Sequence, residues 1–253
     1  MKNSNELILA RREKLLAILK ESKRRSIDDL SQQLEVSAMT IRRDCHVLEE
    51  MGKVTQKLGF VSLVAPSEEP NQAVEVIKER LGAEASRFIQ DEEIIFMNSS
   101  STALQALKYL LDKKVFILTN NANSTKFLNE KNKATLIMSG GEINNRLIMC
   151  GDLAVQSFGS MRADWGIIGC AGLNVDHGIS SPFITEATVN RTIVQNSNKL
   201  IVVADYRKLN AFSNFTIGSI KDVDVLITDT FAPAKIINDI QKQGVRVIQI
   251  PSL

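Results

Sequence analysis

The sequence has little of what several classes of protein require. Its three cysteines are far apart and odd in number, which fits reduced thiols better than a disulfide framework. His177 and His46 are its only histidines and neither lies near a cysteine pair, so we expect no metal site and no cofactor. No apolar run approaches the ~20 residues that span a bilayer. The first residues also lack the apolar core of a signal peptide, so we expect a cytoplasmic protein.

What is present is typical of a soluble globular chain with a small domain beside a larger one. The 253 residues are 44% apolar and 24% charged, with no long Pro/Gly/Ser tract. Residues 1–65 carry twelve Lys/Arg and nine Asp/Glu, whereas residues 66–253 carry nineteen and twenty. This mild basic excess in residues 1–65 is weak evidence for nucleic-acid binding by itself, since differences in net charge of this size are common on solvated surfaces.

Helical spacing predicts three helices in the first fifty residues. Apolar residues through 8–19 mark the first helix, and a basic turn follows at 23–25. Ser26 resembles the N-cap of a short second helix whose apolar face is Ile27, Leu30 and Leu34. Ser37 can cap a third helix in which Ile41, Cys45 and Leu48 form one stripe, so this stripe should pack on the first two helices.

The side of the third helix opposite that stripe carries groups suited to DNA. At ~100° per residue, Arg43 and Met39 point away from the stripe, with Thr40, Arg42 and His46 on the flanks. Arg can chelate guanine O6 and N7, and Thr can meet phosphate or a thymine methyl, when such a helix enters the major groove. Spacing alone leaves open an ordinary three-helix domain with a solvated basic face.

The residues themselves narrow that choice. The stretch LSQQLEVSAMTIRRDCHVLEEMGKV, residues 30–54, closely resembles the DNA-binding segment of DeoR-family repressors, in which V-S-x-x-T-I-R-R-D opens the recognition helix. The resemblance implies that Ser37, Thr40, Arg42 and Arg43 contact DNA, and that Asp44 orients the two arginines. It also implies a winged helix-turn-helix domain.

Residues 54–63 alternate enough to predict the two strands of the wing. Lys53 and Lys57 are placed to approach phosphates. The family commonly ends its wing with a Gly-Gly-Ala turn after a basic residue, whereas this chain has Lys-Leu-Gly-Phe at 57–60.

A linker and an α/β domain follow. Residues 65–72 are polar, contain two prolines and have no period, so they predict a linker between domains 1–64 and 73–253. A helix is expected at about 73–89. Short β-branched runs then alternate with helical stretches, which indicates a mostly parallel sheet covered by helices. The expected strands are 93–97, 114–119, 134–138, 165–169, 199–204, 223–228 and 245–250.

The loops after these strands should share one edge of the sheet, which we call the rim. Ligands of open α/β sheets bind at the carboxyl ends of the strands, and these loops are rich in hydroxyl, amide and charged groups. The candidate ligand residues are Asn98, Ser99, Ser100, Ser101, Thr102, Thr119, Asn120, Gly140, Gly141, Gly172, Asp205 and Lys208. The loop 98–102 joins a strand to a helix, where hydroxyls and free N–H groups suit a phosphate. The alternative is that its Ser/Thr run only caps a helix and that Gly140-Gly141 is only a turn.

Residues 76–229 are similar to the sensor domain of DeoR-type regulators, which shares its fold with ribose-5-phosphate isomerase and coenzyme A transferases. The resemblance rests on loop 98–102, on Thr119-Asn120, on Gly140-Gly141 and on Glu186, among other positions. It implies a phosphorylated sugar or related metabolite as effector and adds Glu186 to the ligand residues. The chain departs from the family at Asn98, where many members have Asp, at Ser100, where many have Gly, and at Asn190, where Lys is frequent.

These observations predict a transcription repressor of a carbohydrate-metabolism operon, released from its operator by a phosphorylated sugar. Because one helix-turn-helix buries little surface, a homodimer or homotetramer is expected. We expect no enzymatic activity, but two alternatives stay open. One is a sugar-phosphate isomerase or transferase with a DNA-binding appendage, in which Glu186 is the base and Lys208 an electrostatic partner. The other is a constitutive DNA-binding protein with a vestigial sensor.

Overall fold

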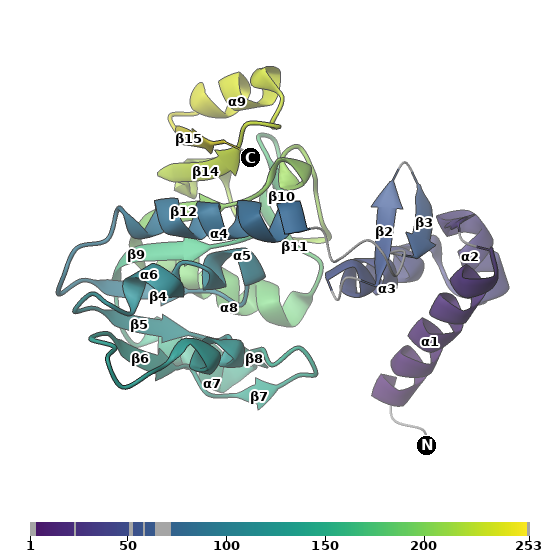
Figure 1. Cartoon of the computed structure of the whole chain (residues 1–253), viewed down its shortest axis with the longest axis horizontal. Coiled ribbons are helices and arrows are strands. Elements are labelled where there is room, and N and C mark those ends of the chain that lie inside the picture. Colours follow the sequence, from purple (N-terminus) through teal and green to yellow (C-terminus); the bar gives the residue numbers. More distant parts are fainter. Residues whose placement is uncertain (1–3, 23, 51–52, 58, 64–71, 252–253) are drawn as a thin grey trace. The chain divides into compact units, whose positions relative to one another are not determined.

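The structure, a computed structural model, describes residues 4–22, 24–50, 53–57, 59–63 and 72–251. Contacts divide the chain between Val74 and Glu75 into an N-terminal unit and a C-terminal unit, and each is described by itself (Figure 1). The predicted linker lies outside the described residues except for Gln72, which begins a helix. No helix of the described residues is both long and apolar enough to cross a membrane.

The described residues of the N-terminal unit form three helices and a three-stranded antiparallel sheet. Its helices are α1 (Ser4–Ser22), α2 (Ile27–Gln33) and α3 (Ala38–Glu50), and its strands are β1 (Arg24–Ser26), β2 (Val54–Lys57) and β3 (Phe60–Leu63). The three helices and the two wing strands are confirmed. The basic turn predicted at 23–25 is wrong in part, because Arg24 to Ser26 run extended beside β3 and add a third strand in the order β1-β3-β2.

The core of the N-terminal unit is the predicted one. Ser26 caps α2 by accepting a hydrogen bond from the Asp29 N–H at 3.0 Å. The stripe of α3 is buried and packs against α1, α2 and the wing, in a cluster made of Leu15, Leu19, Ile27, Leu30, Ile41, Cys45, Leu48, Val54 and Val61. Burial of this stripe leaves the opposite side of α3 at the surface.

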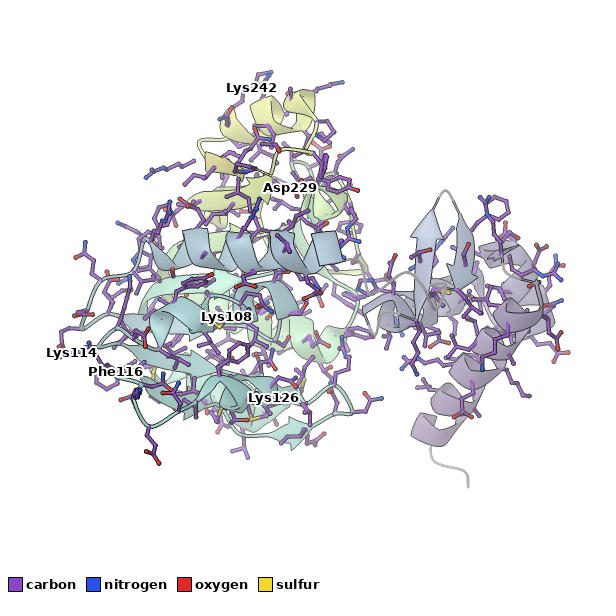
Figure 2. The ribbon with its side chains drawn as sticks, in the orientation of Figure 1. Lys108, Lys114, Phe116, Lys126, Asp229 and Lys242 are labelled. Carbon is purple, nitrogen blue, oxygen red and sulfur yellow. The ribbon has the colours of Figure 1, made fainter. Side chains whose placement is uncertain are left out.

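The C-terminal unit is built on a seven-stranded parallel sheet in the order β15-β14-β12-β9-β4-β5-β6. All seven predicted strands are confirmed, with ends that differ by at most two residues. They are β4 (Ile94–Met97), β5 (Phe116–Thr119), β6 (Thr135–Met138), β9 (Ala163–Ile168), β12 (Ser197–Val203), β14 (Val225–Asp229) and β15 (Arg246–Ile250). Figure 2 labels Phe116, which starts β5, and Asp229, which ends β14, toward opposite edges of the sheet.

Helices cover both faces of this sheet because its strands are apolar on both sides. Ile95 and Met97 pack with α4 (Gln72–Ser86), α5 (Ser101–Leu104) and α6 (Leu107–Leu110). Phe96, which points to the other face, packs on Phe158 and belongs to the core cluster of that face, to which α7 (Asp152–Gly159), α8 (Ile184–Gln195) and α9 (Ala234–Gln241) contribute. The predicted α/β class is therefore confirmed.

The C-terminal unit also contains smaller elements that the sequence patterns did not predict. They are the hairpin β7 (Glu142–Ile143) and β8 (Met149–Cys150), the antiparallel sheet of β10 (Gly172–Asn174), β11 (Gly178–Ser181) and β13 (Phe215–Gly218), and three 3-10 turns, η1 (Ala122–Phe127), η2 (Tyr206–Lys208) and η3 (Ile220–Asp222). These strands have two to four residues each, too short for a periodic signal. The turn between β7 and β8 and the connection from β11 to α8 both supply side chains to the rim.

Candidate functional site

The exposed side of α3 presents the residues predicted to contact DNA. The Ser37 hydroxyl accepts a hydrogen bond from the Thr40 N–H at 3.2 Å and lies 2.9 Å from the Thr40 hydroxyl, so Ser37 caps the helix as predicted. The predicted contact residues on this side are exposed or half-buried: Met39, Thr40, Arg42, Arg43 and His46. The N-terminal half of α3 thus offers guanidinium and hydroxyl groups of the kind that bind bases and phosphates.

Asp44 binds two arginines of α1 and not the arginines of its own helix. Its side chain is 1% exposed, and its two carboxylate oxygens accept hydrogen bonds from Arg11 Nε at 2.5 Å and Arg12 Nε at 2.9 Å. The prediction that Asp44 orients Arg42 and Arg43 is therefore wrong. The physical reason is that Asp44 lies on the side of α3 turned to α1, whereas Arg42 and Arg43 lie on the surface.

Basic residues lie in and next to the wing. Lys53 is exposed just before β2, and the Lys57 backbone pairs with Phe60, but the Lys57 side chain lies outside the described residues. Arg24 of β1 stacks on the Phe60 ring at 4.2 Å. The predicted turn at 23–25 did not place Arg24 on a strand beside the wing. The run of basic residues at 23–25 was the one signal in the sequence that this segment could have a function.

Asn98 is the hydrogen-bonding centre of the loop at 98–102. The side chain is 2% exposed. Its Nδ2 donates to the Gly169 carbonyl at 2.9 Å and to Asn190 Oδ1 at 3.2 Å, and its Oδ1 accepts from the N–H groups of Gly169 and Ser100. Because Asn98 uses its side-chain groups in this way, it holds the loop against the end of β9 and the middle of α8.

The cap interpretation of the Ser/Thr run holds for Ser100. Its hydroxyl accepts hydrogen bonds from the N–H groups of Thr102 at 3.1 Å and Ala103 at 3.4 Å. These donors, which the sequence suggested for an anion, already have an acceptor within the chain. Ser101 is exposed and Thr102 is buried. The helix that follows is a single turn, so its dipole is weaker than that of a long helix.

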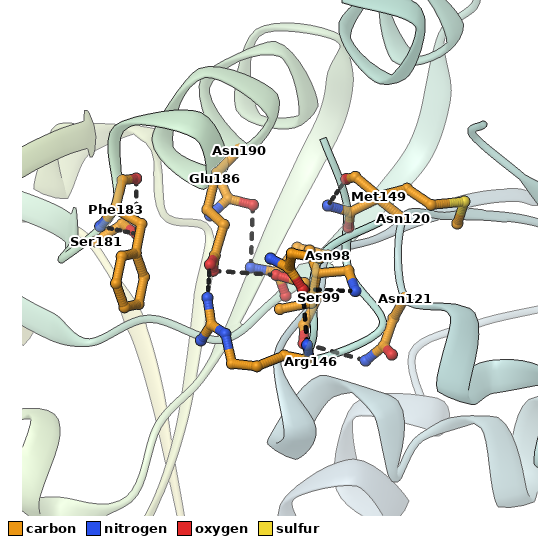
Figure 3. A network of polar contacts seen from close by, with 12 residues as sticks. Asn98, Ser99, Asn120, Asn121, Arg146, Met149, Ser181, Phe183, Glu186 and Asn190 are labelled. Carbon is orange, nitrogen blue, oxygen red and sulfur yellow. Dashed lines mark hydrogen bonds and ion pairs between the residues drawn. The ribbon is translucent and has the colours of Figure 1, made fainter. Parts of the chain in front are cut away.

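Glu186 and Arg146 form an ion pair at the rim (Figure 3). Glu186 lies in the first turn of α8, and its Oε2 accepts a hydrogen bond from the Ser99 hydroxyl at 3.5 Å. Arg146 comes from the turn between β7 and β8, and its guanidinium lies 4.4 Å from the centre of the Phe183 ring. The prediction included Ser99 and Glu186 but missed Arg146, whose only signal was its position shortly after the Gly-Gly pair.

The last residue of β5 and the residue after it are more deeply buried than a ligand contact requires. Thr119 and Asn120 are fully buried, and Asn120 Nδ2 donates to the Met149 carbonyl at 3.0 Å. In the described part of the chain, Asn120 Oδ1 has no hydrogen-bond partner. Asn121, which belongs to the same polar loop but is not among the predicted ligand residues, donates through Nδ2 to the Ser99 carbonyl at 3.1 Å. Asn121 is thus the residue of this loop that is bonded to the 98–102 loop.

The predicted glycines allow close backbone approaches. Gly140 and Gly141 have φ of 71° and 105°, in the left-handed region. A Cβ on Gly141 would lie 2.3 Å from the Cys150 carbonyl oxygen, and one on Gly172 would lie 2.4 Å from the Ala211 carbonyl oxygen. Both glycines are therefore needed for packing, whatever they do for a ligand.

Asp205 and Lys208 lie near one another after β12. Burial opposes ionisation of Asp205, but hydrogen bonds and charge from Arg207, with the charge of Lys208, outweigh it and lower the Asp205 pKa. Arg207 Nε and Nη2 reach the Asp205 carboxylate at 2.8 and 3.1 Å. Burial raises the pKa of Cys170 to about 12, and the nearby Lys208 charge acts in the opposite direction. Since Cys170 follows Gly169, this group adjoins the loop held by Asn98.

The predicted residues thus form two neighbouring groups on the rim, one around Asn98 and Glu186 and one around Asp205. A cavity of about 410 Å³ lies elsewhere in the C-terminal unit. Residues of β10, the turn after it and α9 line that cavity, among them Asp176, Lys235 and Asp239. None of the predicted ligand residues lines it, so the cavity is separate from the rim.

A winged helix-turn-helix unit followed by an α/β unit with a polar rim is the architecture of a DNA-binding regulator with a sensor domain. Residues 11–66 match the DeoR-like helix-turn-helix domain, and residues 75–230 match the DeoR C terminal sensor domain. The second match alone covers more than half of the chain. The chain belongs to the DeoR family of transcriptional regulators, which confirms the resemblance drawn from its motifs.

Similar proteins cover nearly the whole chain. The glycerol-3-phosphate regulon repressor of Haemophilus influenzae is 25% identical over 244 residues, which are 94% of this chain and 95% of that protein. The HTH-type transcriptional repressor GlcR of Bacillus subtilis is 25% identical over 246 residues, 93% of this chain and 95% of that protein. Ribose 5-phosphate isomerase A from Methanocaldococcus jannaschii has a TM-score of 0.40 and 15% identity, over 53% of this chain and 54% of that one.

Proposed function

We propose that this chain represses a carbohydrate-metabolism operon and leaves its operator when a phosphorylated sugar binds the C-terminal unit. The observation that carries the proposal is the exposed, capped recognition helix on a chain that matches named repressors along nearly their whole length. The name of one relative refers to a regulon of a phosphorylated polyol, which supports the effector class.

The proposed DNA contacts come from α3 and the wing. On α3, Arg42 and Arg43 bind base edges or phosphates, and the capped N-terminus points its hydroxyls at the backbone. The residues assigned to DNA are Ser37, Met39, Thr40, Arg42, Arg43, His46, Lys53 and Lys57. One such unit buries too little surface for tight specific binding, so we infer a dimer or tetramer through the C-terminal unit, on repeated half-sites.

The proposed effector site is the rim. Of the predicted residues, those whose side chains bond only to other side chains or reach the surface would contact the ligand. The side chains bonded to backbone groups, the buried Thr102 and the glycines would hold the loops. We assign contact to Ser99, Ser101, Glu186 and Lys208, and loop placement to Asn98, Ser100, Thr102, Thr119, Asn120, Gly140, Gly141, Gly172 and Asp205. Hydroxyl, carboxylate and ammonium groups together suit a ligand that has both hydroxyls and a phosphate.

Operator binding tests the DNA half of the proposal. An operator is first selected from a random duplex pool with the full chain, and affinities are then measured by gel shift at fixed salt. Arg43→Ala should weaken binding by about 1–3 kcal/mol, or roughly five- to 150-fold, because a bidentate base contact is lost. Arg87→Ala is the matched control, since Arg87 is exposed and lies in the C-terminal unit. Equal affinities for both variants would show that α3 is not the reading helix.

Titration of metabolites into the operator complex tests the effector half. Phosphorylated hexoses, pentoses and polyols are compared with their unphosphorylated counterparts, and each mixture is also assayed for chemical conversion. Release and thermal stabilisation of the chain by a phosphorylated compound, without turnover, support a sensor. Turnover would support the isomerase or transferase alternative, and no response to any compound would contradict the proposed effector class.

A further inference from the structure

The turn between β7 and β8 holds Arg146 in a defined place. The Arg146 N–H donates to Asn144 Oδ1 at 2.9 Å, and its carbonyl accepts from Asn123 Nδ2 at 3.2 Å. Leu147, the next residue, has φ of 59°, a left-handed conformation that costs free energy for any residue with a Cβ. The turn adopts this unfavourable conformation while the N–H and the carbonyl of Arg146 are both hydrogen-bonded. The backbone position from which the Arg146 side chain projects is therefore fixed.

The Arg146 side chain is directed into the rim. Its guanidinium lies against the Phe183 ring and pairs with Glu186, which also accepts the Ser99 hydrogen bond (Figure 3). The side chains of Arg146 and Glu186 are 17% and 10% exposed. Three segments far apart in sequence therefore meet at this pair: the loop after β4, the turn between β7 and β8, and the start of α8.

Such a partly buried pair adds little to folding stability. Removing two charges from water costs free energy that offsets much of their mutual attraction. The stacking of the guanidinium on Phe183 keeps its planar fork oriented without help from Glu186. A guanidinium fork binds phosphate oxygens in the same two-point manner as a carboxylate, so phosphate can replace Glu186 on Arg146.

We propose that Arg146 is the anion-binding residue of the effector site and that Glu186 is its internal counter-ion until a ligand arrives. An incoming phosphate monoester takes the guanidinium, and the displaced Glu186 carboxylate then accepts hydrogen bonds from ligand hydroxyls. The ligand class is a phosphate monoester that also carries hydroxyl groups, because a carboxylate separated from Arg146 needs donors in its place. This inference rests on the proposed function and names the residue that selects the phosphate.

Two substitutions should act in opposite directions on the binding of inorganic phosphate, measured by isothermal titration calorimetry on the full chain. Arg146→Ala should weaken it by about ten- to a hundredfold, since hydrogen bonds to a charged group are lost. Glu186→Gln should tighten it, because the competing carboxylate is removed. A merely structural role for the pair would make both variants worse. Arg146→Lys, which keeps the charge and loses the fork, should fall between wild type and Arg146→Ala.

Matched controls separate the exchange from general electrostatics. Glu142→Gln removes an exposed carboxylate from the same hairpin, and Arg162→Ala removes an arginine just before the start of β9, at the amino ends of the strands and so at the end of the sheet opposite the rim. Both should leave phosphate affinity within about twofold of wild type. Equal tightening by Glu142→Gln and Glu186→Gln would overturn the inference, as would the absence of phosphate binding to both wild type and Glu186→Gln.

Glucose 6-phosphate serves as a further probe of the contact between Glu186 and ligand hydroxyls. If Glu186 accepts hydroxyl donors, Glu186→Gln should lower the preference for glucose 6-phosphate over inorganic phosphate. An unchanged preference would overturn the inference that Glu186 binds the ligand hydroxyls. If operator release by a phosphorylated sugar persists unchanged in Arg146→Ala, the inference fails while the proposed function stands. If no sugar phosphate releases the wild type although phosphate binding depends on Arg146, the proposed function fails and the anion site stands.

Discussion

Replacement of Asp44 should destabilise the N-terminal unit without removing a DNA contact. In Asp44→Ala, Arg11 and Arg12 lose the carboxylate that binds both of them, and their charges stay beside the core. Loss of one partner of a buried ion pair typically costs 3–5 kcal/mol. The two arginine side chains are 22% and 12% exposed and can partly regain water, so we expect the lower end, about 3 kcal/mol. Asp44→Asn, which keeps one acceptor oxygen, should cost less.

Amide hydrogen exchange on the full chain measures this loss where it occurs. For exchange limited by local opening, about 3 kcal/mol corresponds to exchange on the order of a hundredfold faster in peptides from α1 and α3. Fluorescence of Trp165, the single tryptophan, reports on the C-terminal unit and should be unchanged. Asp28→Ala removes an exposed carboxylate from the first turn of α2 and is the matched control.

Operator affinity distinguishes this role from a direct contact. While most of the N-terminal unit stays folded, Asp44→Ala should lower the apparent affinity only by the unfolded fraction. Arg43→Ala should instead lower affinity without faster exchange. Wild-type exchange rates in Asp44→Ala would refute the reasoning, because they would show that the contact with α1 contributes nothing to the stability of the unit.

Three further outcomes follow from burial and contact. Cys45→Ser should destabilise the N-terminal unit by about 1–3 kcal/mol, since Cys45 is fully buried, with no change in the selected operator sequence; a changed sequence with normal stability would contradict this. Gly169→Ala should weaken operator release by sugar phosphates, because a Cβ there would lie 1.9 Å from Ser100 Oγ; a wild-type response would show that the loop adapts. Asp205→Asn should lower the free energy of unfolding, measured by urea denaturation at pH 7. Since the folded pKa of Asp205 lies below its ordinary 3.8, this difference should vanish as the pH falls through the folded value, and a pH-independent difference would refute the charge contribution.

Local patterns were enough to predict most elements of the fold. Helical and alternating spacing of apolar residues depends only on neighbours in the chain, so the three N-terminal helices, the caps Ser26 and Ser37 and the seven parallel strands could all be predicted. The motif around Arg42 and Arg43 was sufficient to suggest the family. The parallel order of the strands also placed the polar loops at one edge, since carboxyl ends of parallel strands coincide.

Contacts between distant segments carried no such signal. The two partners of Asp44 lie more than thirty residues away in α1, and the strand β1 forms only because β3 returns beside it. At the rim, Asn98 could be predicted as a loop residue, but its four hydrogen bonds depend on Gly169 and Asn190 as well as on its own loop.

The sequence by itself therefore determined the two-unit organisation, the family, the exposed side of the recognition helix and the loops that form the rim. Only the tertiary structure decided which of those residues form hydrogen bonds within the protein and which oppositely charged side chains pair with one another. The pair of Arg146 and Glu186 is the clearest case, because forty residues separate them and neither lies in a periodic pattern that points to the other. Periodicity reports which side of an element is buried, whereas the choice of a polar partner depends on how separate elements pack.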